Sequence, residues 1–278
     1  MSGRLFVVSL PIGNLSDITL RAIETLRTVD FILAEDTRTT RHVLDRYEIR
    51  TPFYSSFYEG AEDGRAPDVV ELLRSGKDVA LVSDAGTPLV SDPGFPLVRA
   101  AVSAGIQVIP LPGPSAALAA LVASGLPTDR FLFAGSLPRK KSHREVLFAG
   151  LRRETSTTIA YESPHRLQET LDILARELPE REVVIARELT KLHEEFVRGS
   201  TVEVAATFAA RGEIRGECVL LIGGAGDEGD PMDPARLEAV LAVARDEGLS
   251  KKGVERLLVA ALAMPKNRAY EIAHRGET

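Results

Sequence analysis

A twelve-residue stretch at 83–94, SDAGTPLVSDPG, carries the residues best suited to binding a ligand. It combines the carboxylates Asp84 and Asp92 with several hydroxyls, and with glycines and prolines that let a backbone approach a bound molecule closely. A plain connector is usually shorter. The stretch follows an apolar run at 79–82 and precedes a predicted helix at 95–104, so it lies at the carboxyl end of a strand. Open α/β sheets bind their ligands at that end.

Polar residues follow a second predicted strand as well. Residues 35–38, EDTR, come directly after the apolar run at 31–34. Known nucleotide signatures are missing, since the chain has neither G-x-G-x-x-G after its first strand nor G-x-x-x-x-G-K-[ST]. Its five histidines lack metal-ligand spacing, and Cys218 lies in an apolar run that predicts a buried strand residue. We therefore expect no metal site, no P-loop and no nicotinamide-binding site.

Strands and helices alternate about five times before residue 112, which predicts a mostly parallel α/β sheet over 1–112. In this part we expect a strand at 4–10, a helix capped by Ser16 or Asp17, a helix with Pro67 near its first turn, and a strand at 106–111. Residues 113–226 predict a second α/β domain with a mixed sheet. Its expected elements are helices at 115–124, from 164 and from Ser200, and strands at 131–134, 158–162, 182–190, 194–198 and 217–222.

The remaining residues, 227–278, predict a linker and three short helices, with helix-turn-helix as one candidate arrangement. Asp233 and Pro234 have the pattern of a helix start. Six basic residues against two acidic ones lie between 250 and 275, although the whole chain of 278 residues has a net charge of −6. No apolar run approaches the length of a membrane span, and no leader pattern opens the chain, so we expect a cytoplasmic protein.

Six segments, taken in order, resemble the ribosomal RNA small-subunit methyltransferase I family of the tetrapyrrole-methylase superfamily. They are LPIGNLSDITLRA at 10–22, AEDTRTT at 34–40, SDAGTPLVSDPG, PLPGPSA at 110–116, YESPHRL at 161–167 and ELTK at 188–191. The resemblance implies the two α/β domains of a class III methyltransferase, S-adenosylmethionine as cofactor in the cleft between them, and a homodimer. It implies 2'-O-methylation of a cytidine in the decoding region of small-subunit ribosomal RNA.

By the same resemblance, loop residues of both domains should contact the cofactor. They are Pro11, Gly13, Asp84, Ala85, Gly86, Leu89, Val90, Ser115, Ala116, Tyr161 and Glu162. A simpler role stays open for two of them, because Asp84 has the pattern of an Asx-turn and Ser115 that of a helix N-cap.

Methyl transfer to a ribose hydroxyl needs positioning and a base. We expect Asp36 or Glu35 to orient or deprotonate the ribose with help from Lys191, although acids also favour a helix start. Arg38 and Arg41 are candidates for holding phosphates. A basic cluster and the tail are candidates for RNA contact, with plain solvated surface as the alternative; the cluster comprises Arg139, Lys140, Lys141 and Arg144.

Two other functions stay open at this point. A small-molecule methylase of the same superfamily would act on a tetrapyrrole-like metabolite, but the basic tail and the AEDTR and ELTK segments speak against it. A non-catalytic RNA-binding or ribosome-assembly module would have no reason to bind S-adenosylmethionine.

Overall fold

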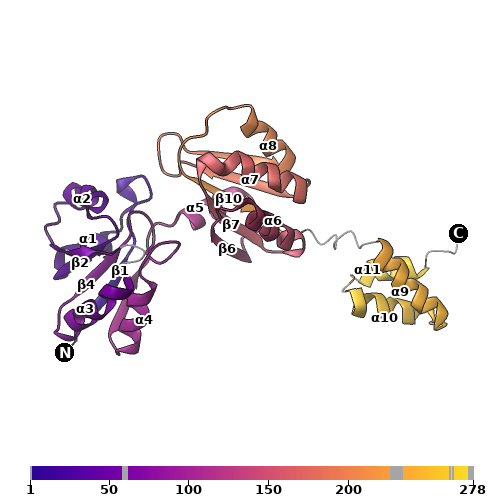
Figure 1. Ribbon diagram of the computed structural model, residues 1–278, viewed down its shortest axis with the longest axis horizontal. Coiled ribbons are helices and arrows are strands. Elements are labelled where there is room, and N and C mark those ends of the chain that lie inside the picture. The colour runs from indigo at the N-terminus through magenta and orange to yellow at the C-terminus, as the bar shows by residue number, and fades with distance from the viewer. Residues whose placement is uncertain (1, 58–61, 226–233, 263, 265, 275–278) are drawn as a thin grey trace.

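The first five strands form a sheet in the order β3-β2-β4-β1-β5, and every neighbouring pair in it is parallel. They are β1 (Arg4–Val8), β2 (Phe31–Ala34), β3 (Phe53–Ser56), β4 (Val79–Val82) and β5 (Gln107–Leu111). The computed structural model describes residues 2–57, 62–225, 234–262, 264 and 266–274 (Figure 1). The predicted parallel sheet is therefore present, with the strand order of an open α/β layer.

Helices cover both faces of this sheet, which explains why its strands read as continuous apolar runs. On one face Ile32 and Val82 pack with α1 (Leu20–Thr28) and α2 (Thr37–Arg46). On the other face Leu33 and Leu81 pack with α3 (Glu62–Arg74) and α4 (Phe95–Ser103). Successive strand residues thus enter opposite halves of the core, as the two-residue period of a strand requires.

Three local predictions for this domain were wrong. The N-cap of α1 is Thr19, whose side chain accepts from the Ala22 amide, while Ser16 and Asp17 lie in a preceding 3-10 turn, η1 (Leu15–Asp17). Pro67 lies inside α3, beyond its first turn. The first strand ends at Val8, because Leu10 turns away to form an isolated bridge with Gly86.

The second sheet has the order β6-β7-β10-β8-β9 and is mixed, as predicted. Strands β6 and β7 are parallel, and the other neighbouring pairs are antiparallel. Its strands are β6 (Phe131–Ser136), β7 (Thr157–Glu162), β8 (Glu182–Arg187), β9 (Glu195–Ser200) and β10 (Cys218–Ile222). Because β8 ends at Arg187, the segment ELTK is a loop and not the end of a strand.

One face of the second sheet is covered by α6 (Lys141–Gly150), α7 (Pro164–Glu177) and α8 (Thr201–Ala209), and the other by α5 (Ala116–Ser124). In α7, Leu167, Leu171 and Leu174 are buried against this face. The helix predicted from Ser200 is present, and Ser200 and Glu203 form a capping box at the start of α8. A short 3-10 turn, η2 (Leu151–Arg153), follows α6.

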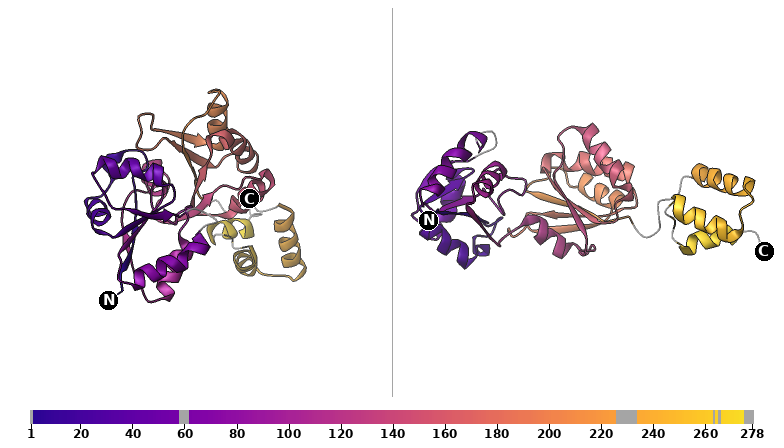
Figure 2. Two further views of the ribbon diagram at one scale, coloured as in Figure 1. Left: turned by 60° about the vertical axis from the view of Figure 1, so that its left-hand side comes forward. Right: turned by 90° about the horizontal axis from the view of Figure 1, so that it is seen from below.

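Three further helices, α9 (Pro234–Asp246), α10 (Lys251–Leu262) and α11 (Lys266–His274), pack on one another around Leu258, Met264 and Ala269. They lie beyond the second sheet in both Figure 1 and the right-hand view of Figure 2. The cap predicted at Asp233 lies outside the described residues, and the helix-turn-helix arrangement stays a prediction. Among the helices of the described part, none has the length and apolar character to cross a membrane.

The predicted architecture is present: two α/β domains, one with a parallel and one with a mixed sheet, and a small helical module. We propose the divisions 1–112, 113–226 and 227–278 for the folded chain, since no strand before residue 112 pairs with a strand after it in the described residues.

Candidate active site

The parallel pairing of the first sheet brings the loops after β1, β2, β4 and β5 to one edge. Strands β1 and β4 are neighbours in the sheet. After β1 the chain continues to β2 on one side of this pair, and after β4 it continues to β5 on the other side. Such a reversal opens a crevice for ligands. The β1 and β4 loops meet there, because the amides of Leu10 and Gly86 each donate to the other residue's carbonyl at 2.9 Å.

The β4 loop, residues 83–94, has unusual backbone angles. Gly86 has a φ of 72°, which favours glycine, and Leu89 and Ser91 have φ values of 71° and 68°. Glu188 and Thr190 in the ELTK loop also have positive φ. Within the described residues, these two loops hold all but one of the non-glycine residues with positive φ. Backbone strain of this kind gathers at functional sites.

The β1 loop also contacts the second domain. The amide of Asn14 donates to Thr190 Oγ1 at 2.9 Å. A Cβ on Gly13 would lie 2.7 Å from Lys191 Cγ and 3.0 Å from the Leu189 carbonyl oxygen. The two domains therefore touch at a junction where residue 13 has no room for a side chain.

Beside this junction lies a cavity of about 510 Å³ with walls from both domains. Such a volume is typical of small-molecule sites. The first domain and α5 contribute Ile12, Ala85, Gly86, Thr87, Val90, Asp92, Ser115 and Ala116. The second sheet and its loops contribute Ser136, Leu137, Arg139, Tyr161, Glu162, Ser163, Pro164, Arg166, Leu189, Glu217, Cys218 and Val219.

Seven of the eleven expected cofactor residues line this cavity: Ala85, Gly86, Val90, Ser115, Ala116, Tyr161 and Glu162. Ser115 occupies the N-cap position of α5, but its side chain makes no capping hydrogen bond. Ser115 is therefore both the N-cap residue of the helix and part of the cavity wall.

The other four expected cofactor residues are not part of the lining. Pro11 is buried, Gly13 lies at the junction with Thr190, and Leu89 packs against the core on the α3 and α4 side. Asp84 accepts a hydrogen bond from the Asp36 amide at 2.9 Å. Its carboxylate therefore ties the β2 loop to the β4 loop.

Asp92 is a wall residue to which the sequence assigned no role, although the carboxylate itself was noted. Burial raises the pKa of Asp92, an effect that a hydrogen bond from Ser83 partly offsets and nearby Asp84 reinforces. Burial also raises the pKa of Tyr161 and raises that of the Cys218 thiol to about 12. The cavity thus holds a protonated phenol, a protonated thiol and a carboxylate that is more basic than usual.

Asp36 has another task besides the one expected. It is the N-cap of α2, with its side chain accepting from the Arg38 amide, and it pairs with the Arg38 guanidinium at 2.6 Å. These hydrogen bonds lower the pKa of Asp36 to about 2. Neither Asp36 nor Glu35 lines the cavity. The helix-start interpretation of AEDTR therefore holds, and a carboxylate of such low pKa is a weak base.

Lys191 lies at the domain junction between two carboxylates, 2.9 Å from Glu188 and 2.9 Å from Glu217. Burial alone would lower the pKa of Lys191, but its hydrogen bonds to Glu217 and Glu188 outweigh burial and raise the pKa. The ammonium is therefore charged at neutral pH. It can stabilise negative charge but cannot accept a proton.

The expected phosphate-binding residues divide between surface and core. Arg38 is exposed and paired with Asp36, and Arg41 places its guanidinium 4.6 Å from the centre of the Phe53 ring. Arg139, Lys140 and Lys141 are exposed.

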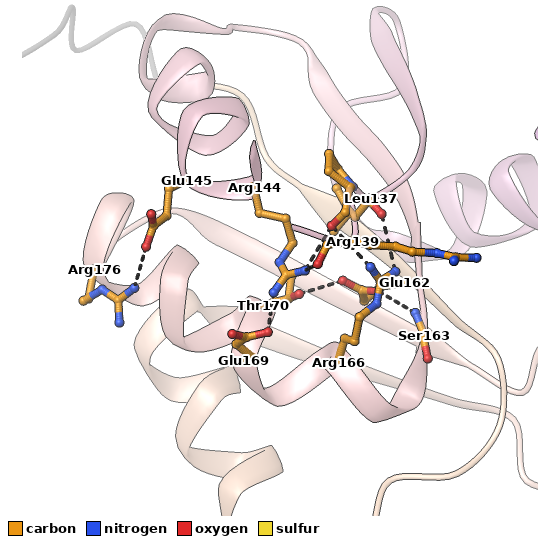
Figure 3. A network of polar contacts seen from close by, with 11 residues as sticks. Leu137, Arg139, Arg144, Glu145, Glu162, Ser163, Arg166, Glu169, Thr170 and Arg176 are labelled. Atoms are coloured by element: carbon orange, nitrogen blue, oxygen red, sulfur yellow. Dashed lines mark hydrogen bonds and ion pairs between the residues drawn. The ribbon is translucent and has the colours of Figure 1, made fainter. Parts of the chain in front are cut away.

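Arg144 contradicts its expected role, because its side chain has no exposed area (Figure 3). Its guanidinium pairs with Glu169 and donates to two backbone carbonyls. A phosphate cannot reach it in this conformation. Within the described residues, no group of three or more His, Cys, Asp or Glu side chains is arranged to hold a metal ion.

The family profile of Tetrapyrrole (Corrin/Porphyrin) Methylases matches residues 4–205. A relative from Synechocystis sp. named "Ribosomal RNA small subunit methyltransferase I" is 44% identical over 98% of this chain and 97% of its own length. A relative of the same name from Bacillus subtilis is 42% identical over 98% of this chain and 94% of its own. The chain belongs to the ribosomal RNA small subunit methyltransferase I family. The resemblance found in the six segments is thereby confirmed.

Solved structures outside this family share its fold. The methyltransferase CobJ superposes with a TM-score of 0.61 and 24% identity, covering 81% of this chain and 95% of CobJ. The uroporphyrin-III C-methyl transferase of Thermus thermophilus, solved with S-adenyl homocysteine, has a TM-score of 0.55 and 21% identity, covering 80% of this chain and 97% of that one. At these identities the likeness shows the fold alone.

Proposed function

We propose that this chain transfers a methyl group from S-adenosylmethionine to the ribose 2'-oxygen of a cytidine in the decoding region of small-subunit ribosomal RNA. The observation that carries the proposal is membership of a ribosomal RNA methyltransferase family over nearly the whole length. A cavity of suitable size between the two domains supports it.

The cavity suits S-adenosylmethionine in size and in donor chemistry. Its walls combine backbone at Ala85 and Gly86 with the hydroxyls of Thr87 and Ser115 and the apolar side chains of Ile12 and other residues. An amino-acid end and an adenine are recognised by such neutral groups and by closely approaching backbone. When bound, S-adenosylmethionine supplies a methyl group activated by its sulfonium.

The chain must orient the ribose hydroxyl and remove its proton. Asp92 is better suited to receive that proton than Asp36, because Asp92 lines the cavity and its pKa is raised. The pKa of Asp36, by contrast, is about 2. General-base efficiency rises as the pKa of the base approaches the working pH. Lys191, charged and near the cavity through its partner Glu217, stabilises the negative charge that grows on the ribose oxygen.

Three substitutions separate these roles. Asp92→Asn should lower the methylation rate by about 10²- to 10⁴-fold, the usual contribution of a general base. Lys191→Met should lower the rate with little change in cofactor affinity. Asp36→Ala should lose the α2 cap, because alanine has no side-chain acceptor for the Arg38 amide, and should lower stability more than rate. Parent-like turnover by Asp92→Asn would remove Asp92 from the reaction and return Asp36 and Glu35 as candidates.

We assign RNA binding to exposed basic residues, with Arg139 in the cavity wall and Lys140, Lys141, Arg38 and Arg41 outside its lining, and to the basic residues of the helical tail. The homodimer stays a prediction. Exposed apolar side chains on α5 and β6 support it; they are Leu118, Val122, Phe131 and Leu132. Sedimentation of the parent chain and of a Val122→Lys variant would test whether this surface pairs with a second copy.

The decisive experiment incubates the protein with labelled S-adenosylmethionine and either small ribosomal subunits or naked small-subunit RNA, and then maps the modified nucleoside. The expected product is a single 2'-O-methylcytidine in the decoding region. Label on a base or on another nucleotide would refute the proposed specificity for the cytidine 2'-oxygen, although the chain would still be an RNA methyltransferase. Absence of label from both substrates would refute the function.

A further inference from the structure

Arg144 is a buried cation that holds a turn of the cavity wall. From α6 its Nη1 donates to the carbonyl oxygens of Pro138 and Arg139, both at 3.0 Å. Its Nη2 pairs with Glu169 on α7. Figure 3 shows this guanidinium between the turn and α7. Arg144 therefore holds the turn that follows β6 by hydrogen bonds to the backbone of the turn.

A second arginine holds the same turn from α7. Arg166 donates to the carbonyls of Pro138 at 3.2 Å and Leu137 at 3.4 Å. It also pairs at 2.6 Å with Glu162, whose side chain has no exposed area. Three successive carbonyls, at 137, 138 and 139, thus accept from two guanidinium groups (Figure 3).

A gain in folding stability does not by itself explain why two arginines hold the 137–139 turn. Each of the two ion pairs has one fully buried partner, Arg144 or Glu162, and burying a charge in this way often stabilises a fold no more than well-packed apolar residues of similar volume. Arg144 Nε is moreover buried without a hydrogen-bond partner in the described part of the chain. What a guanidinium does offer is a rigid fork of donors that fixes the geometry of its acceptors.

The side chain carried by this turn is Arg139, which is exposed and lines the cavity. Among the described residues it has no hydrogen-bonded or ion-paired side-chain partner, and in Figure 3 its guanidinium points away from the network. The charges of Arg144 and Arg166 are matched by Glu169 and Glu162. Arg139 therefore presents a positive charge without an ion-pair partner among the described residues at the cavity wall.

We propose that Arg144 and Arg166 are positioning residues that hold the 137–139 turn so that Arg139 binds a phosphate oxygen of the RNA substrate beside the reacting ribose. The inference rests on the proposed function. Arg139 matches this task because an exposed planar fork binds phosphate oxygens in pairs. A phosphate held at the cavity would fix the distance between the ribose and the methyl donor.

The test measures binding of small ribosomal subunits in the presence of S-adenosylhomocysteine, as a function of salt. Each phosphate contact contributes about 0.7 to 0.9 to the slope of log affinity against log salt, or about four- to sixfold in affinity at 0.15 M salt. Arg139→Met should lose this amount. Arg144→Met should lose the same amount although its side chain cannot touch RNA, and the double variant should lose no more than either single variant.

Arg176→Met is the matched control. Arg176 on α7 pairs with Glu145 on α6 at 3.5 Å, so it joins the same two helices and carries the same charge without touching the turn (Figure 3). Its slope should equal that of the parent. Hydrogen exchange adds a readout that needs no RNA: the Leu137 amide, which donates to the Tyr161 carbonyl at 2.9 Å, should exchange faster in Arg144→Met than in Arg176→Met.

Arg144→Lys serves if Arg144→Met does not fold, because it keeps the charge opposite Glu169 but lacks the fork. It should change the slope in the same direction as Arg139→Met. A parent-like slope for a folded Arg144 variant would overturn the positioning role. Weaker binding of S-adenosylhomocysteine by Arg139→Met with an unchanged RNA slope would overturn the phosphate contact and assign Arg139 to the cofactor carboxylate instead. Failure of the parent to bind subunits would refute the proposed function itself.

Discussion

Substituting Gly13 by alanine should weaken cofactor binding as well as the fold, because the new side chain would crowd the junction between the two domains. The new Cβ would lie 2.7 Å from Lys191 Cγ, 2.8 Å from Thr190 Oγ1 and 3.0 Å from the Leu189 carbonyl oxygen. Carbon atoms pack best at about 3.5 to 4.0 Å, so the β1 loop must move from the ELTK loop by about 1 Å. The hydrogen bond from Asn14 to Thr190, now 2.9 Å, would break.

The magnitude follows from what the junction supports. Keeping the loops together costs about 1 to 3 kcal/mol of overpacking, whereas separating them loses one hydrogen bond of about 1 kcal/mol. The free protein should therefore open the junction and lose about 1 kcal/mol of stability. Because Ile12 and Leu189 on either side of this junction line the cavity, binding must close it again. The cost of closing is the difference between the overpacking energy and the hydrogen-bond energy, up to about 2 kcal/mol, which would lower cofactor affinity by up to about 30-fold.

Titration calorimetry with S-adenosylhomocysteine measures the affinity, and thermal unfolding measures the stability. Gly64→Ala is the control, since Gly64 lies in α3 and a Cβ added there would meet no neighbouring atom within 4 Å. This control should gain about 0.5 to 1 kcal/mol of stability from reduced backbone freedom and bind the cofactor like the parent. Parent-like affinity of Gly13→Ala would show that the junction does not shape the cofactor site.

Three further predictions concern charge. Burial raises the pKa of Asp92, so the ionised carboxylate lowers the stability of the folded chain at neutral pH. At a pH above the raised pKa, Asp92→Asn should therefore melt at a higher temperature than the parent. The difference in melting temperature should vanish as the pH falls below about 3.9, the pKa of aspartate in the unfolded chain. Cys218, with a pKa of about 12, should react with iodoacetamide at pH 8 about a thousandfold more slowly in the folded than in the unfolded chain, as mass spectrometry would show. Replacing Lys252, Arg256 and Lys266 together by glutamine should lower the slope of log RNA affinity against log salt concentration by about 2 to 3, and it should leave cofactor affinity unchanged. An unaltered slope would show that the tail does not contact the RNA.

Local patterns were sufficient for most elements. The apolar runs at 31–34 and 79–82 are the strands β2 and β4, with the predicted bounds. Helix starts were harder to predict, because several capping residues stood close together. The structure uses Thr19 where Ser16 and Asp17 were expected, since a 3-10 turn precedes the helix.

The site residues show what a sequence leaves undecided. The pattern AEDTR is compatible with a cap and with a base, and only the hydrogen bonds of Asp36 to Arg38 and the position of Asp36 outside the cavity favour the cap. Arg144 belongs to a run of basic residues that look alike in sequence. The helical period of α6 turns it into the core while Lys140 and Lys141 face solvent.

The sequence by itself determined the fold class and the family, and it predicted the β4 loop as a binding loop, because strand and helix periods, glycine and proline positions and ordered motifs are local properties. Tertiary structure alone decided that Asp92 and Arg139 line one cavity, that Asp84 ties two loops together, and that Arg144 and Arg166 hold the turn at 137–139. The physical reason is that burial, charge pairing and pKa depend on which distant segments meet. Such contacts are set by the packing of whole domains.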